Sequence, residues 1–228
     1  MTQEISNIVK GLVDNIDCTI DGVFDAQTMQ VNVCKTKWAR IGKIVTNSTN
    51  DEYIITDILV DEWIKVDKVL QSSPDLDGVI TLPIPYWLAG TKIAANREWT
   101  IGDNIVMEKT PVIWMLELIR YTGYGRDSTL QFDSEIRLFI LDETDVVNYY
   151  VEDHRQQVVL PMENLMLELM NTISKDRNFK KIDEYSVGTF SRFGLEKDNG
   201  MFQNILDANL SGLELKFRLV KYKENCKC

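Results

Sequence analysis

The fold is decided by residues 131–174, which read QFDSEIRLFILDETDVVNYYVEDHRQQVVLPMENLMLELMNTIS. Residues 135–141 alternate between polar and apolar side chains and then become an apolar run, which is typical of a strand that enters a core. After a short polar link, apolar residues recur every three or four positions, which places them on one stripe of a helix. The members of this stripe are Val158, Met162, Leu165, Met166, Leu169 and Ile173. The stretch therefore predicts an amphipathic helix that lies on a sheet.

Pro161 interrupts the helical stripe. Proline has no backbone N–H and a fixed φ, so it is tolerated in the first turn of a helix but disrupts the interior. Two outcomes follow. Either the helix restarts with Pro161 at its first position, or it bends where one backbone hydrogen bond is lost, and the sequence leaves both open.

The other periodic segments predict a second helix and several strands. Residues 4–13 carry apolar side chains at helical spacing, and residues 212–221 alternate in the manner of a strand with one wet face. Further strand-like segments cover 39–46, 53–60, 63–66, 79–82 and 106–118. The predicted fold class is α+β, with a mostly antiparallel sheet packed by an N-terminal helix and a long late helix. We expect one domain over residues 1–228.

Residues 18–35 contain two strand-like segments around a four-residue loop and predict a β-hairpin. In the expected register Ile20 lies opposite Val33 on one apolar face. Cys18 and Cys34 then fall on opposite faces of the hairpin, so we expect no disulfide between them.

Residues 83–105 have no steady period, and we expect them to form an irregular insertion or a projecting loop. This segment contains Tyr86, Trp87 and Trp99. Large aromatic side chains outside regular elements often anchor a protein partner, so these three residues form a candidate interface. Packing inside the molecule is the alternative.

Composition limits the classes of function. The formal charge is −10, which argues against a broad basic surface for gripping nucleic acid or an anionic membrane. No basic region precedes an apolar run at the N-terminus, so we expect no secretory signal. The four cysteines are too few and too scattered for a disulfide scaffold, which favours a reducing compartment.

Motifs for chemistry are weak. His154 is the single histidine, so a histidine-dependent catalytic or metal site would have to use it, and its place at the start of a helix favours an ordinary polar role. Cys226 and Cys228 form a C-x-C pair without a second cluster, which we interpret as an incidental tail. We therefore expect no enzyme activity, no catalytic or metal site and no cofactor.

Four segments carry a resemblance to a known family. They are residues 34–42 (CKTKWARIG), 109–117 (KTPVIWMLE), 159–162 (VLPM) and 210–215 (LSGLEL). The chain resembles the tail-terminator-like and head-tail connector (neck) proteins of tailed bacteriophages, including ring proteins of the crAss-like group. The similarity spans most of the chain and includes no catalytic signature.

This resemblance implies a tail-terminator-like fold and a structural virion protein that forms a homo-oligomeric ring in the neck or tail. The ring would connect the portal side of the capsid to the tail, contact other neck, portal and tail proteins, and let DNA pass through its lumen. The implied location is the virion, after assembly in the host cytoplasm, with no membrane partner. From the charge of −10 we also expect acidic side chains to line the lumen. The alternative is a soluble, non-viral adaptor that captures another protein through the aromatic segment.

Overall fold

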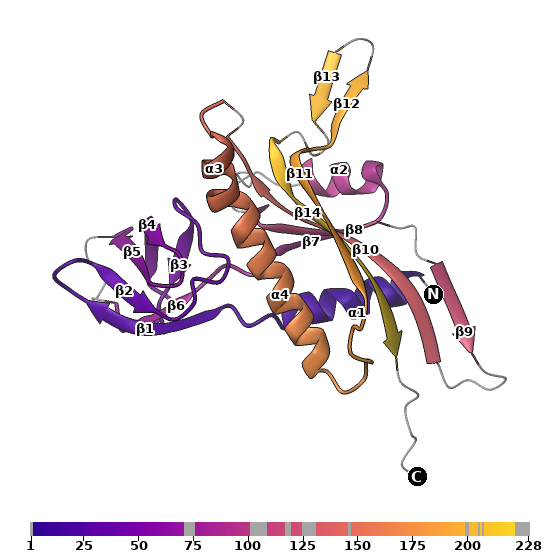
Figure 1. Ribbon diagram of the computed structural model, residues 1–228, viewed down its shortest axis with the longest axis horizontal. Coiled ribbons are helices and arrows are strands. Elements are labelled where there is room, and N and C mark those ends of the chain that lie inside the picture. The colour runs from indigo at the N-terminus through magenta and orange to yellow at the C-terminus, as the bar shows by residue number, and fades with distance from the viewer. Residues whose placement is uncertain are drawn as a thin grey trace.

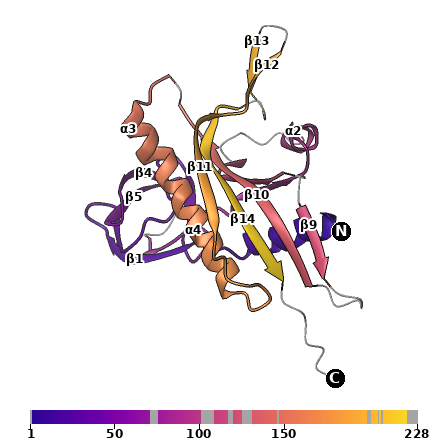
Figure 2. The same ribbon diagram turned by 45° about the vertical axis from the view of Figure 1, so that its right-hand side comes forward.

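The computed structural model describes residues 2–70, 76–100, 109–116, 120–124, 131–145, 147–198, 201–204, 206 and 208–221. They form a mixed α+β molecule in which a small barrel lies beside a larger body built on a sheet (Figures 1 and 2). The barrel and the sheet body share one continuous set of buried apolar residues. None of the described helices has the length and apolar composition needed to cross a lipid bilayer.

The barrel follows helix α1 (Thr2–Asp14) and closes six antiparallel strands in the order β1-β2-β5-β4-β3-β6. Inward-facing side chains such as Val31, Tyr53, Ile64 and Ile80 are fully buried and fill its interior. Closure removes the free edges of this sheet. The strands are β1 (Thr19–Asp25), β2 (Gln30–Val33), β3 (Ile44–Thr46), β4 (Glu52–Leu59), β5 (Trp63–Lys68) and β6 (Val79–Thr81).

The larger body is a sheet with the strand order β11-β14-β10-β8-β7, in which β9 also pairs with β10. The β7–β8 pair is parallel, and the other pairs are antiparallel. A hairpin of β12 (Leu195–Asp198) and β13 (Met201–Asn204) projects from the end of β11 (Figure 1). The sheet strands are β7 (Tyr86–Ala89), β8 (Val112–Met115), β9 (Arg120–Tyr124), β10 (Gln131–Glu143), β11 (Tyr185–Phe193) and β14 (Leu210–Lys221).

Helices cover both faces of this sheet. The inner face packs on α1 and on α4 (Leu160–Lys175), and every residue of the predicted apolar stripe from Val158 to Ile173 is buried there. The outer face carries a second core, around Trp114 and Phe139, which is covered by α2 (Lys92–Thr100). The prediction of a helix lying on a sheet is confirmed, as is the alternation of the last strand.

The helix does not restart at Pro161, and the departure from the regular hydrogen-bond pattern falls in the turn before it. The chain runs from α3 (Val151–His154) through a π-helical segment, η2 (Arg155–Val159), directly into α4, and Val159 and Leu160 both keep right-handed helical dihedrals. Proline cannot donate to the carbonyl four residues earlier and its ring crowds that carbonyl. The wider π turn accommodates this mismatch without breaking the helix.

The predicted hairpin forms, but its register differs by two residues. Val33 pairs with Gly22 instead of Ile20. The tight turn determines this pairing, because Met29 adopts a positive φ of 56° and Asp25 accepts a hydrogen bond from the backbone N–H of Gln27. A shift of two residues leaves each side chain on its expected face. Cys18 and Cys34 are both free, as expected.

Other predicted elements change because of long-range contacts. The sequence predicts one sheet, whereas the strands divide between the barrel and the sheet body because β6 closes onto β1. The expected strand 39–46 shortens to β3, since the preceding residues form turns. The expected irregular insertion at 83–105 contains β7, which is the last strand of the sheet, and α2, which packs on the sheet, while its residues 101–105 lie outside the described residues.

Candidate interaction surface

The three aromatic residues of the predicted interface occupy different environments. Tyr86 and Trp87 lie on β7, at the end of the sheet order, and both are half-buried. Trp99 lies on α2 and is buried in the outer core. Its ring meets Tyr86 edge to face, with ring centroids 6.3 Å apart. Trp99 therefore anchors α2 to the sheet, and the interface prediction continues to apply to the two residues on β7.

β7 forms one edge of the sheet, and its side chains alternate between the two cores. Tyr86 and Leu88 belong to the outer core, whereas Trp87 and Ala89 pack against the inner core. Among the strands that the structure describes, β8 alone pairs with β7. The strand therefore ends the sheet with apolar side chains on both faces.

β11 forms the opposite edge, and the sequence analysis missed it. Residues 185–190 and Phe193 pair with β14 on one side, with a bulge between Phe190 and Phe193, and no described strand pairs with its other side. Tyr185 is 49% exposed and Val187 is 40% exposed, both on the inner face. Residues 185–191 include no proline and no charged side chain, which are the usual protections of an edge strand. The short alternation of β-branched and aromatic residues here was the signal available in the sequence.

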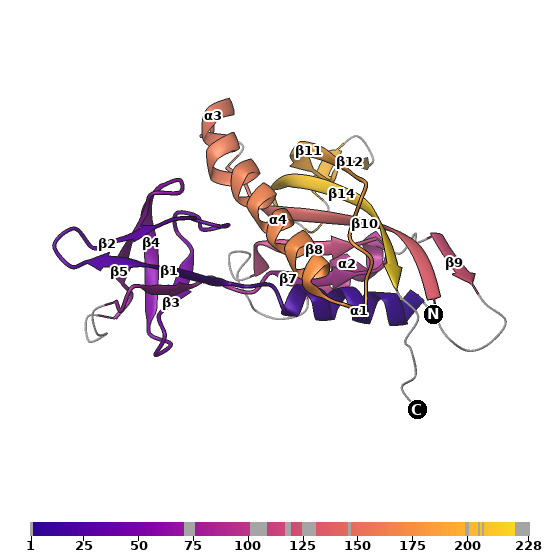
Figure 3. The same cartoon turned by 60° about the horizontal axis from the view of Figure 1, so that its bottom comes forward.

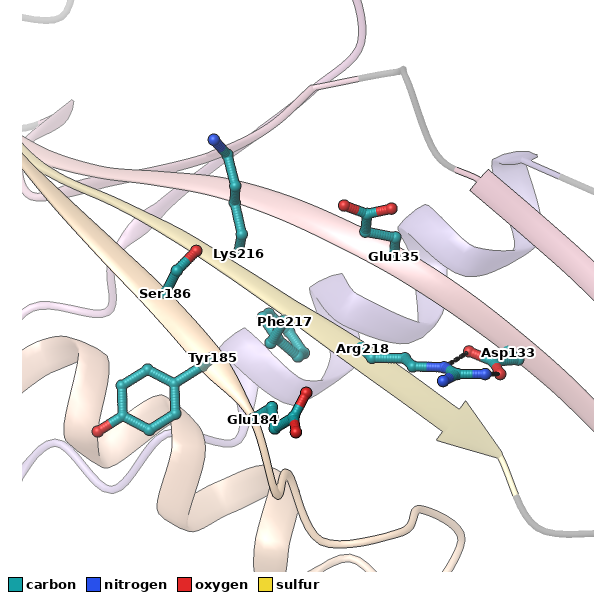
Figure 4. Close-up of a pocket in the computed structure, with 8 residues that line it drawn as sticks. All are labelled: Asp133, Glu135, Glu184, Tyr185, Ser186, Lys216, Phe217 and Arg218. Carbon is teal, nitrogen blue, oxygen red and sulfur yellow. Dashed lines mark hydrogen bonds and ion pairs between the residues drawn. The ribbon is translucent and has the colours of Figure 1, made fainter.

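Beside this edge, the outer face of the sheet carries a set of ion pairs between neighbouring strands. An open hollow of about 570 Å³ lies here, between β11, β14 and β10 (Figure 4). Arg218 reaches Asp133 across β14 and β10, as the figure shows. Glu214 bonds with both Arg137 and Lys216, and its distance to Lys216 is 3.3 Å. These ion pairs lie on β14 and β10, whereas residues 185–191 of β11 beside them carry no charged side chain.

The single histidine meets a serine at the other end of the sheet. Nε2 of His154 lies 2.7 Å from Oγ of Ser211, which is directly opposite Asp142 in the β10–β14 register. Ser211, His154 and Asp142 are the residue types of the nucleophile, base and acid of a catalytic triad. However, Ser211 is 0% exposed, so a substrate has no access to its hydroxyl.

The carboxylate of Asp142 pairs with two basic side chains from the barrel and not with His154. Its Oδ1 lies 3.0 Å from Nη1 of Arg40 and 3.3 Å from Nζ of Lys43, and Lys43 also donates to the carbonyl of Thr110 at 2.8 Å. Burial opposes ionisation of Asp142, but the two cations outweigh it and hold the pKa of this carboxyl below its usual value. This cluster ties the barrel to the sheet body.

Protonation of the histidine is also disfavoured. Burial, and then the positive charge of Arg40, lower the pKa of His154. The neutral ring hydrogen-bonds Ser211 and supports the α3 helix on the sheet. In the described part of the chain, no three His, Cys, Asp or Glu side chains gather in a way that would hold a metal ion. Cys226 and Cys228 lie outside the described residues.

We compared the chain with known protein families, proteins and structures. No protein family model, no curated protein and no solved structure matches this chain.

Proposed function

We propose that this protein is a structural virion component of a tailed bacteriophage, with a tail-terminator-like fold. In this proposal its copies form a ring in the neck or tail, which joins the portal side of the capsid to the tail and lets DNA pass. The proposal follows the four sequence segments that resemble neck ring proteins. Its partners would be copies of itself and the neighbouring neck, portal and tail proteins.

The observation that carries the proposal is the edge strand β11, whose residues 185–190 contain no charged side chain, no proline and no bulge. With exposed Tyr185 and Val187, this stretch presents a row of backbone donors and acceptors to which another chain can add. Soluble monomers usually guard such an edge with lysine, proline or a bulge. In β11 such guards are confined to the end of the strand, where Arg192 lies and a bulge falls between Phe190 and Phe193. Association between copies of the protein would cover the unguarded residues 185–190.

The acidic barrel supports a role beside DNA. Among its described residues, Lys35 is the one basic residue with an exposed side chain. The exposed acidic residues from the start of the barrel onwards are Asp17, Asp21, Glu52, Asp57, Asp61, Glu62, Asp67 and Asp77. A negative wall repels DNA instead of holding it, which suits a channel through which DNA moves. We therefore assign the lumen side of the proposed ring to the barrel.

The corner before α3 offers a contact for a different partner. Val147, Tyr150 and Val151 are almost fully exposed there, which is unusual for three large apolar side chains so close in sequence. In the proposed assembly they would pack on the next protein along the neck. An adaptor outside a virion would use the same corner to bind its partner.

Native mass spectrometry and negative-stain electron microscopy of the purified full chain test the proposal. We expect one closed ring with a single copy number, either alone or on addition of the neck proteins encoded beside it. Antibody labelling of intact particles should place the protein between capsid and tail. A monomer that stays monomeric with those proteins present and is absent from particles would contradict the proposal and would favour the adaptor.

A further inference from the structure

The two free edges of the sheet are matched in position and in direction. The strands follow one another from β11 to β7 in Figure 3. Starting from β10, the antiparallel pairs place β11 in the same direction as β10 and β8 in the opposite direction. β7 is parallel to β8. A copy placed beside the first would therefore bring β11 next to β7 in the antiparallel orientation, which continues the order of the sheet.

The register places both edges at the same level. Tyr86 occupies the same cross-strand row as Phe190, through Val112, Leu141 and Gly212. Ala89 occupies the same row as Val187, through Met115, Leu138 and Leu215. All four residues of β7 thus have a counterpart on β11 without any displacement along the strands.

The side chains at the two edges also match. On the outer face, Tyr86 and Phe190 are both partly buried at the margin of the outer core. On the inner face, Ala89 lies at the margin of the inner core and Val187 is exposed. Pairing of the two edges would join outer core to outer core and inner core to inner core. No charged residue lies in residues 86–89 or 185–191 to oppose this contact.

We propose that β7 of one copy pairs with β11 of the next copy in an antiparallel ladder, with Tyr86 opposite Phe190 and Ala89 opposite Val187. The occupant of each edge is a second copy of this chain, because the two edges share their level, direction and face pattern. The inference rests on the proposed self-association. It adds that the contact joins two different surfaces, which is the kind of contact that closes into a ring.

Disulfide trapping tests this register. In the full chain with Cys34, Cys226 and Cys228 replaced by serine, Ala89→Cys and Val187→Cys place one thiol on each edge. Paired residues in a ladder have Cα atoms close enough for a disulfide. A mixture of the two single variants should give cross-linked dimers under mild oxidation, and the double variant should give a ladder of bands up to the full ring.

Two controls use other pairs in the same background. Ala89→Cys mixed with Ser186→Cys places the second thiol on the opposite face of β11, so no cross-link is expected. Val187→Cys alone should also give none. A dimer from Val187→Cys alone would show that β11 pairs with β11 and would overturn the proposal.

An edge variant separates the contact from the fold. Val187→Lys should convert the ring to monomers without lowering the melting temperature, whereas Leu167→Lys, at a site on α4 that is 48% exposed, should leave the ring intact. If native mass spectrometry finds a ring but the 89–187 pair does not cross-link, the β7–β11 contact is wrong and the ring proposal stands. If it finds only monomers and no cross-link forms, both proposals fail.

Discussion

Arg40 and Asp142 form a buried ion pair across the junction between the barrel and the sheet body, with Nη1 and Oδ1 3.0 Å apart. Arg40 lies in the turns before β3, and Asp142 lies near the end of β10. Because Lys43 shares the same carboxylate, one acidic group compensates two buried cations. Asp142 thus joins the barrel to the sheet body through two buried ion pairs.

Replacing this carboxylate should destabilise the protein strongly. Asp142→Asn removes the buried carboxylate that pairs with both Arg40 and Lys43, and such a loss costs about 3–5 kcal/mol. Urea unfolding would measure the free energy of unfolding. Asp67→Asn, at an exposed position on β5, is the matched control and should change it by less than about 0.5 kcal/mol. Equal effects of the two substitutions would show that the ion pair does not support the junction.

The single histidine should make stability depend on pH near neutrality. The pKa of His154 is lower in the folded protein than its ordinary value of 6.5, so the unfolded chain takes up the proton more readily. The contribution of His154 to stability is therefore complete above about pH 6.5 and decreases as the pH falls below that value. The free energies of unfolding of the wild type and of His154→Gln should therefore become more similar as the pH is lowered. A constant difference across this range would contradict the assignment.

Replacing glycine with alanine should change the stability of the protein in opposite directions at two positions. Gly212 has a φ of 150°, and a Cβ there would collide with the backbone carbonyl of Ile140. Gly212→Ala should therefore cost well over about 1 kcal/mol. Gly11 lies inside α1 with open space around it, so Gly11→Ala should stabilise by about 0.5–1 kcal/mol. Thermal unfolding of both variants measures the contrast, and a tolerated alanine at 212 would refute it.

Two leucines on α4 offer a test of the helix orientation. Leu169→Ala removes a fully buried side chain from the inner core and should cost about 2–5 kcal/mol. Leu167 is exposed on the same helix, so Leu167→Ala should have an effect below about 0.5 kcal/mol. Denaturant unfolding distinguishes them. If both substitutions lowered the free energy of unfolding by similar amounts, Leu167 would have to be buried in solution, which contradicts this orientation of α4.

Charge reversal on the barrel should create an affinity for DNA. The triple variant Asp21→Lys, Glu52→Lys and Asp67→Lys changes exposed barrel positions. We expect this variant to bind labelled double-stranded DNA at low salt, as measured by fluorescence anisotropy, and the affinity should decrease as the salt concentration rises. The matched control reverses three exposed acidic residues of the sheet body, Glu98, Glu135 and Glu152. Equal DNA binding by both variants would contradict the assignment of the barrel to the lumen.

The aromatic residues show how far residue types alone can predict a site. Tyr86, Trp87 and Trp99 stood out because they are large and lie in a segment without periodicity. The structure assigns two of them to an edge strand and places the third on the buried side of α2. The sequence did not show this, because the regular elements here are too short for a periodic signal. β11 was missed for a related reason: an edge is defined by the absence of a neighbouring strand, and the residues of the strand itself do not encode that absence.

By itself the sequence determined the local elements. The stripe from Val158 to Ile173 and the alternation after Gly212 both predicted which side chains are buried, because helical and strand periods repeat over a few residues. Only the tertiary structure decided that β6 closes a barrel onto β1, that Arg40 meets Asp142, and that β7 and β11 end the same sheet at the same level. These relationships join segments far apart in the chain, and they depend on which apolar faces meet when the chain collapses.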